Sequence, residues 1–254
     1  MQMRKRLMAA AGTASLALFP GGAFAGESVD YKVEDSDYQG YYAPASGDGE
    51  PAGLVLIIHD WDGLNDYEME RADMLAELGY DAFAVDLYGA GNRPESTEAK
   101  KAETNKLYED REAMRARIVG GLEAARGQSD AGQAVIIGYC FGGAAAMEAA
   151  RSISAENIAG YAAFHGGLTT PEGQSYRDDT APILILQGGA DDSTPPSEAY
   201  ELADTLEKQG ITYGLHVYSG APHAFTVFGS DRYQQRADEN SWLVFQQFLK
   251  DNLG

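Results

Sequence analysis

Runs of consecutive apolar residues alternate along this chain with longer segments whose apolar residues recur every three or four positions. The runs lie at residues 54–58, 82–87, 134–137, 158–164 and 182–186. Runs of this length without polar alternation are typical of parallel strands that are buried on both faces. A further strand is predicted over 212–218, and a hairpin formed by 29–33 and 39–42 precedes the first run.

The segments between these strands predict helices. Residues 66–78 carry apolar side chains at helical spacing and end at a glycine, as helices often do. The charged stretch 94–126 predicts two helices or one helix with a bend, and further helices are predicted over 196–209 and 232–249. This alternation predicts an α/β fold with a mostly parallel central sheet, helices on both faces, and ligands at the carboxyl ends of the strands.

The first 25 residues have the features of a secretory signal peptide. Arg4, Lys5 and Arg6 form a positive region, residues 7–19 are apolar, and Ala-Phe-Ala at 23–25 is a cleavage signal. The apolar stretch is shorter than the about 20 residues that a membrane-spanning helix needs. We therefore predict an exported protein, periplasmic or secreted, with no membrane attachment after cleavage.

Residues 26–254 are predicted to form a single domain, because no linker or internal repeat divides them. We expect this domain to be a monomer. Its one cysteine, Cys140, excludes an intrachain disulfide. A lone thiol in an exported protein is better explained by chemistry than by structure.

The chain is strongly acidic, with 39 Asp and Glu residues against 19 Lys and Arg residues and a formal net charge of −20. Removal of the three basic residues of the leader would bring the charge to about −23. Such a charge repels nucleic acid and anionic lipid surfaces, so neither is an expected partner. An ordinary solvated surface and an adaptation to high salt both account for the acidic excess.

The cysteine lies in the hexapeptide Gly-Tyr-Cys-Phe-Gly-Gly at 138–143, directly after a predicted strand and before a helix of small residues. This is the pattern of a nucleophile elbow, a strained turn in which glycines two before and two after the nucleophile prevent collisions. A buried free cysteine beside a glycine turn is the alternative interpretation. A histidine and an acid farther along the chain favour the elbow.

These partners occur in the order that hydrolases with such an elbow require, with the acid after a late strand and the histidine after the last one. Asp191 is the first carboxylate past the strand at 182–186, and His223 lies in the loop after the strand at 212–218. Asp192 is the alternative acid. Three other histidines are less suited to the role of base: His216 lies within a strand, and His59 and His165 lie at strand ends that border the same crevice.

With these residues placed, the chain resembles the dienelactone hydrolase family of cysteine α/β-hydrolases over nearly its whole length after the leader. The resemblance is carried by six motifs: His-Asp-Trp-Asp-Gly-Leu-Asn at 59–65, Asp-Leu-Tyr-Gly at 86–89, Gly-Tyr-Cys-Phe-Gly-Gly at 138–143, Phe-His-Gly-Gly at 164–167, Gly-Ala-Asp-Asp at 189–192 and Gly-Ala-Pro-His-Ala-Phe at 220–225. It implies an α/β-hydrolase fold and a triad of Cys140, Asp191 and His223.

Two departures from the family pattern concern the site. Members commonly have a glutamate that contacts the nucleophile, and this chain has the shorter Asp60 there. Members that cleave dienelactone bind the substrate carboxylate with two arginines, whose positions here are Ala90 and Val227. Arg93 is close enough in sequence to replace the first of them. The resemblance therefore implies the chemistry of the family more strongly than its namesake substrate.

The predicted reaction is hydrolysis of a small ester or lactone through a thioacyl-enzyme. His223 would take the proton of a thiol that is partly ionised near neutral pH and favoured as an anion by the helix that follows, and Asp191 would orient the imidazole. The backbone N–H groups of Phe141 and Trp61 would form the oxyanion hole. The residues proposed to line the substrate pocket are Tyr88, Arg93, His165 and Phe225.

No cofactor or metal is predicted, because the sequence has neither zinc-ligand spacing nor a phosphate-binding glycine loop. The alternative to an enzyme is a ligand-binding or thiol redox-sensing protein on the same scaffold. A sensor needs a reactive cysteine but not a histidine and an acid in the order of a hydrolase. The enzyme is therefore the favoured interpretation.

Overall fold

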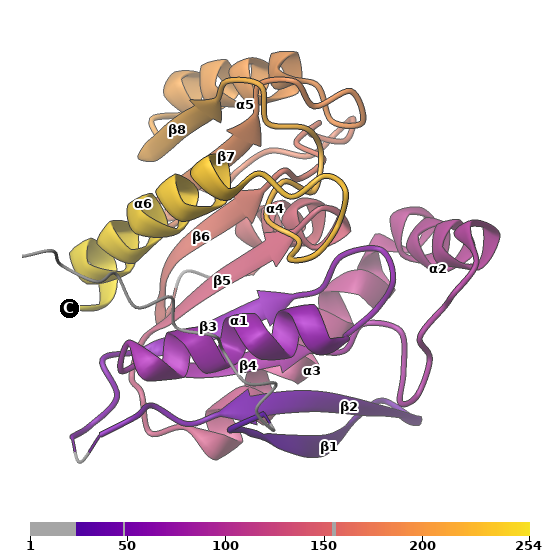
Figure 1. Cartoon of the computed structure of the whole chain (residues 1–254), viewed down its shortest axis with the longest axis vertical. Coiled ribbons are helices and arrows are strands. Elements are labelled where there is room, and N and C mark those ends of the chain that lie inside the picture. Colours follow the sequence, from indigo (N-terminus) through magenta and orange to yellow (C-terminus); the bar gives the residue numbers. More distant parts are fainter. Residues whose placement is uncertain (1–23, 48, 154–155) are drawn as a thin grey trace, which may run out of the picture.

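The computed structural model describes residues 24–47, 49–153 and 156–254. Except for its last two residues, the predicted leader lies outside the described residues. Eight strands form one sheet in the order β1-β2-β4-β3-β5-β6-β7-β8 (Figure 1). Their bounds are β1 (Glu27–Val33), β2 (Ser36–Ala43), β3 (Leu54–Ile58), β4 (Asp81–Val85), β5 (Ala134–Tyr139), β6 (Ile158–Phe164), β7 (Ile183–Gly188) and β8 (Tyr213–Tyr218).

The first two strands form an antiparallel hairpin, and β2 is also antiparallel to β4. All other neighbours in the sheet are parallel. The predicted strands and the mostly parallel sheet are thus confirmed. Because the six neighbouring strands β4, β3, β5, β6, β7 and β8 run in one direction, their carboxyl ends meet along one edge.

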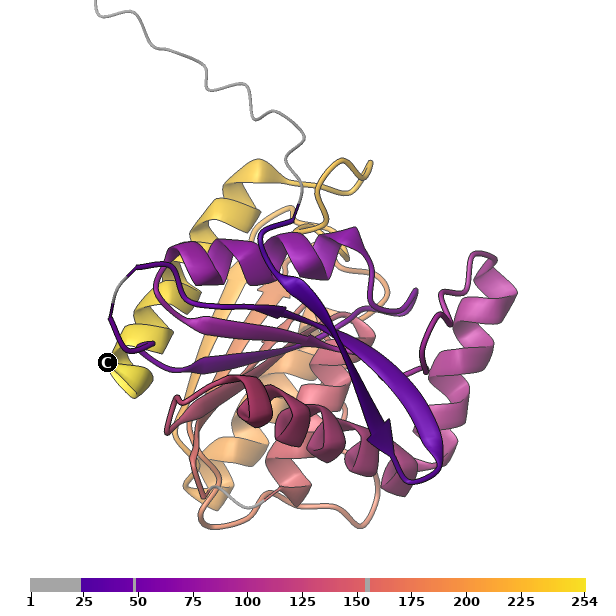
Figure 2. The ribbon, with the colours of Figure 1, turned by 90° about the horizontal axis from the view of Figure 1, so that it is seen from below.

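Helices cover both faces of the sheet, as predicted (Figure 2). Residues from α1 and α6 pack on one face, and residues from α3, α4 and α5 pack on the other. The helix bounds are α1 (Asp66–Glu77), α2 (Thr97–Glu109), α3 (Arg111–Gln128), α4 (Phe141–Ser152), α5 (Pro196–Gln209) and α6 (Gln235–Leu253). No helix within the described residues is long and apolar enough to cross a membrane.

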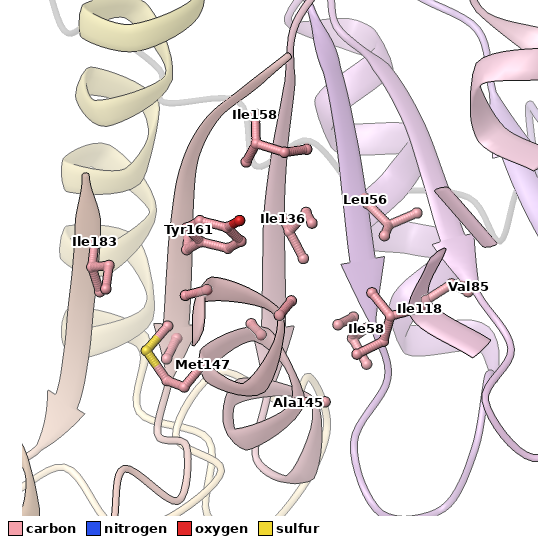
Figure 3. Close-up of a cluster of buried hydrophobic side chains, with 14 of the residues drawn as sticks. Leu56, Ile58, Val85, Ile118, Ile136, Ala145, Met147, Ile158, Tyr161 and Ile183 are labelled. Carbon is pink, nitrogen blue, oxygen red and sulfur yellow. The ribbon is translucent and has the colours of Figure 1, made fainter. Parts of the chain in front are cut away.

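Alternate residues of the buried strands supply the two cores, as the strand geometry requires. Leu54, Leu56 and Ile58 of β3 point to one face, and Val55 and Ile57 point to the other. Figure 3 shows the first of these cores, where side chains of the strands meet those of α3 and α4. Burial on both faces explains why these strands lack polar positions.

The structure decides between the two predictions for 94–126 and moves the start of the last helix. The charged stretch 94–126 forms two helices, which separate at Asp110, whose side chain caps α3 by accepting a hydrogen bond from the N–H of Ala113. The last helix begins at Gln235 rather than 232, so that prediction is wrong at its start. The N–H of Gln234 donates to the carbonyl of Phe225 at 3.0 Å, which ties this segment to the preceding loop.

Candidate active site

The predicted site residues meet at the carboxyl edge of the sheet. Cys140 directly follows β5, Asp191 lies three residues after the end of β7, and His223 lies in the loop after β8. His59 and His165 follow β3 and β6 directly. Parallel strands therefore bring together residues that are up to 164 positions apart, from 59 to 223, in the sequence.

The backbone at Cys140 has the strained geometry that the elbow motif predicts. Its φ is 53° and its ψ is −113°, a conformation that costs a non-glycine residue about 1–3 kcal/mol. The N–H of Cys140 donates to the carbonyl of Phe164 at 3.0 Å, and the Cys140 carbonyl accepts from the N–H of Gly143 at 3.1 Å. A β-carbon at Gly138 would lie 2.0 Å from the carbonyl oxygen of Gly142, so this turn requires glycine.

His223 lies between the cysteine and the acid. Its Nε2 is 3.1 Å from Cys140 Sγ, and its Nδ1 is 2.9 Å from Asp191 Oδ2. Asp191 is buried, whereas Asp192 is exposed. His216, on β8, is also exposed. The structure therefore brings Cys140, His223 and Asp191 into hydrogen-bond contact, and not their sequence alternatives.

Several donors hold the Asp191 carboxylate. Its Oδ1 accepts from the N–H groups of Ser193 and Thr194, and its Oδ2 accepts from the Thr194 hydroxyl and the Gln187 amide. Burial alone would raise the pKa of Asp191, but the hydrogen bond and charge of His223 and the donors from Thr194 lower it to about 2. Thr194 and Gln187 were not predicted, because nothing in their spacing marks them as partners of Asp191.

The surroundings of the Cys140 thiol raise its pKa and so oppose its ionisation. Burial raises its pKa, the charge of Asp60 raises it further, and the N–H of Phe141 lowers it only in part. Burial therefore opposes the partly ionised thiol that the sequence predicts. The sequence indicated the helix that favours the anion, but not the burial that opposes it.

Asp60 belongs to a cluster of carboxyl groups beside Cys140. No hydrogen bond joins its carboxyl to Cys140 Sγ within the described part of the chain; instead Asp60 Oδ1 accepts from the N–H of Asp62 at 3.0 Å. The Asp60 N–H donates to Glu68 Oε1. Burial, a hydrogen bond with Asp62 and the charge of Glu68 hold the pKa of Asp60 well above its usual range. The Asp60 carboxyl is therefore held by its acidic neighbours and not by the thiol.

The two predicted oxyanion-hole donors flank Cys140. Phe141 is the first residue of α4, and its N–H faces the Cys140 sulfur. Trp61 lies in the loop between β3 and α1, and its N–H has no acceptor among the described residues. The Trp61 carbonyl accepts a hydrogen bond from the Tyr88 hydroxyl at 3.1 Å. Tyr88 thus anchors the loop between β3 and α1 through this hydrogen bond.

Beside Cys140 lies a cavity of about 400 Å³ that also borders Trp61 and His223. Tyr108 and Lys101 of α2 and Arg232 form part of its wall. In both ribbon views α2 projects from the side of the molecule (Figures 1 and 2). Nothing in the charged sequence of α2 predicts this contribution, because only the tertiary structure places the helix beside Cys140.

The four residues predicted to line the pocket lie outside this cavity wall. Tyr88, His165 and Phe225 are buried behind it. Arg93 forms an ion pair with Asp86 at 3.5 Å and donates to the carbonyl of Asn92. The prediction that these four residues line the pocket is therefore wrong for this cavity. Side chains near a strand end can point into the core as readily as into the crevice.

Comparisons with known proteins agree with one another. Residues 39–253 match the model of the dienelactone hydrolase family. The chain is 28% identical over 212 residues to a probable 2-oxo-3-(5-oxofuran-2-ylidene)propanoate lactonase of Bradyrhizobium sp., covering 76% of this chain and 80% of that relative. It is 26% identical over 191 residues to the carboxymethylenebutenolidase of Pseudomonas putida, covering 72% and 79% of the two chains. A dienelactone hydrolase-like promiscuous phosphotriesterase from metagenomic libraries has a similar structure, with a TM-score of 0.82, 26% identity and coverage of 92% of this chain and 100% of that chain.

Proposed function

Because this chain belongs to the dienelactone hydrolase family and is a hydrolase of esters or lactones, we propose that it cleaves its substrate through a triad of Cys140, His223 and Asp191. The observation that carries the proposal is the continuous contact from Cys140 Sγ through His223 to Asp191, with separations of 3.1 Å and 2.9 Å. The order and geometry of these groups are those of nucleophilic acyl transfer.

In the first step, Cys140 Sγ attacks the carbonyl carbon while His223 Nε2 takes the thiol proton. Burial holds the pKa of the thiol high, so proton removal accompanies the attack rather than preceding it. Asp191 accepts the Nδ1–H of His223 and so leaves Nε2 free to receive the proton. The N–H groups of Phe141 and Trp61 bind the negative oxygen of the tetrahedral intermediate.

Collapse of this intermediate breaks the bond to the leaving alkoxide, which takes the proton from His223. A lactone opens at the same bond, so its alcohol stays attached to the acyl group. Water then attacks the thioester, and His223 accepts a proton from that water. The products are a carboxylic acid and an alcohol, and the Cys140 thiol regains its proton.

We infer that the substrate is small. A cavity of about 400 Å³ beside Cys140 supports this inference, since ligand pockets of about 300–1,000 Å³ accommodate drug-sized molecules. Thiol nucleophiles acylate readily with activated esters and lactones and poorly with amides, which favours an esterase or lactonase over a peptidase. The lactonase and butenolidase names of two relatives make lactones the first substrates to test.

The test is hydrolysis of a panel of aryl esters and small lactones, dienelactone included, by wild type and Cys140→Ala. Turnover should disappear in the variant and in wild type treated with a thiol alkylator. Thiol-independent turnover would overturn the cysteine mechanism. A folded wild type that is readily alkylated but hydrolyses no member of the panel would favour a ligand-binding or redox-sensing protein.

We also propose that the protein is exported and is cleaved after Ala25. The positive residues 4–6, the apolar stretch 7–19 and the Ala-Phe-Ala sequence at 23–25 support this proposal. N-terminal sequencing of protein recovered from outside the cytoplasm should begin at Gly26. Protein that stays in the cytoplasm and keeps residues 1–25 would contradict it.

A further inference from the structure

Thr226 connects the loop of His223 to the interior of the protein. This residue is fully buried three positions after His223. Its hydroxyl oxygen lies 2.7 Å from the hydroxyl of Tyr67 and 2.8 Å from His165 Nε2. Its carbonyl accepts a hydrogen bond from Arg71 Nη2 at 2.9 Å. The hydroxyl and the backbone carbonyl of Thr226 thus join the loop to α1 and to the end of β6.

Arg71 links Thr226 to the buried Asp238 of α6. Its side chain is buried and forms an ion pair with Asp238 of α6, which also accepts from the hydroxyl of Tyr233 at 3.1 Å. The guanidinium lies 4.2 Å from the ring centre of Phe228. Its Nε donates to the Tyr67 hydroxyl at 3.3 Å. The guanidinium of Arg71 is therefore held by an ion pair, by hydrogen bonds and by aromatic rings at the same time.

One chain of hydrogen bonds runs through this network from Arg71 to His165. Burial, and then the neighbouring His223, hold the pKa of His165 well below its usual range, so its ring is neutral. Arg71 Nε donates to the Tyr67 oxygen, and the hydroxyls of Tyr67 and Thr226 continue the hydrogen-bonded chain to His165 Nε2. A neutral His165 also avoids repelling His223, whose ring lies 5.3 Å away edge to face.

The backbone on both sides of the network is strained. Ala224, directly after His223, has a φ of 60°, and His165 has a φ of 40°. Non-glycine residues keep such conformations only where the surrounding structure over-determines them. The hydrogen bonds of Thr226 supply that constraint at a point two residues beyond Ala224.

We propose that Thr226 is a positioning residue that keeps His223 Nε2 within hydrogen-bond reach of Cys140 Sγ. The proposal rests on the proposed function, in which His223 takes the thiol proton. Thr226 touches neither the cavity beside Cys140 nor the reacting atoms. Its effect should therefore fall on the rate of proton transfer and not on substrate binding.

The experiment compares Thr226→Val, which keeps the shape but removes the hydroxyl, with Thr226→Ser, which keeps the hydroxyl. We expect Thr226→Val to lower kcat about 10- to 100-fold with little change in KM, because small displacements of a reacting group have effects of this size. Thr226→Ser should restore kcat to within about threefold of wild type. Equal losses in both variants, or no loss in Thr226→Val, would overturn the proposal.

A second readout does not depend on hydrolysis. The rate of Cys140 alkylation by iodoacetamide, followed against pH, reports how well His223 takes the thiol proton. Thr226→Val should react more slowly near neutral pH, with its profile displaced to higher pH. If wild type hydrolyses no ester but the profiles differ in this way, the proposed function fails and the positioning role stands. Identical profiles would refute the positioning role whatever the turnover.

Should Thr226→Val fail to fold, a pair of Tyr→Phe variants decides the question. Tyr67→Phe removes the hydroxyl that links Arg71 to Thr226. Tyr161→Phe removes a buried hydroxyl that has no hydrogen-bond partner among the described residues, so it is the matched control. We expect a lower kcat and a displaced alkylation profile for Tyr67→Phe alone. The same result for both variants, or no effect of Tyr67→Phe, would contradict the proposal.

Discussion

Gly142 lies against the end of β3 so closely that a β-carbon at this position would be 2.1 Å from the carbonyl oxygen of Ile58. Gly142 is the second residue of α4, and Ile58 is the last residue of β3. This approach brings the start of the helix after Cys140 next to the loop that contains Trp61. The two proposed oxyanion-hole donors are therefore placed by one contact between backbone segments.

Gly142→Ala should destabilise the protein, because both the new β-carbon and the Ile58 carbonyl are fixed to backbone. We expect a loss of about 3 kcal/mol or more in the free energy of unfolding, the upper end for overpacking. Gly127→Ala is the control, since Gly127 is exposed in α3 with no neighbour within 4 Å of a new β-carbon. It should gain up to about 1 kcal/mol from helix propensity. Denaturant unfolding measures both, and a Gly142→Ala variant as stable as wild type would disprove the steric argument.

Asp191→Asn should lower kcat strongly while Asp192→Asn should not. An asparagine at 191 can present its N–H₂ to His223 Nδ1, which would favour the wrong tautomer, and we expect a loss of about 100-fold or more. Asp192 is exposed and makes no contact with His223, so its variant is the matched control. Steady-state kinetics on one activated ester test the pair. A larger loss in Asp192→Asn would exchange the roles of the two acids.

The stability of the protein should depend on pH through Glu68. Burial raises the pKa of this carboxyl to about 8, although the N–H groups of Asn65 and Asp60 oppose the rise. A carboxyl with a raised pKa binds its proton more tightly in the folded state. Its contribution is therefore fully present below about pH 4.5 and is lost as pH rises toward 8.

Glu68→Gln should remove this loss, because glutamine cannot ionise. Unfolding by urea at pH 5 and pH 8 should show a smaller difference in the variant than in wild type, by about 1 kcal/mol or more. Glu70→Gln, at an exposed position of the same helix, should leave the wild-type difference unchanged. Equal pH dependence in wild type and Glu68→Gln would show that Glu68 is not the titrating group.

Glu148 should be important for stability, because it is buried and pairs with Arg111, Arg115 and Arg151. Burial would raise its pKa, but hydrogen bonds from Arg151 and Arg115 lower it. We expect Glu148→Gln to cost about 3 kcal/mol, since it leaves buried arginine charge without its partner. Asp204→Asn, which breaks an exposed ion pair with Lys208, should cost less than about 1 kcal/mol. Thermal and denaturant unfolding measure the stability of both variants. Equal losses in the free energy of unfolding would contradict the importance of Glu148 for stability.

Much of the fold was predictable because its signals are local. Apolar runs such as the one at β5 reflect burial on both faces, and the glycines around Cys140 reflect a turn that excludes side chains. The order of Cys140, Asp191 and His223 follows from where strands end. These features depend on a few neighbouring residues, so they can be recognised without knowledge of distant segments.

The tertiary structure decided what depends on distant neighbours. The sequence by itself determined the alternation of strands and helices and the three residues that meet at the sheet edge. It did not determine that burial raises the pKa of the Cys140 thiol, that Lys101 and Arg232 border the cavity, or that Thr226 ties the His223 loop to Arg71. Desolvation, cavity walls and buried hydrogen bonds arise where segments far apart in the chain come together. A pattern within one segment cannot show which distant segment will pack against it.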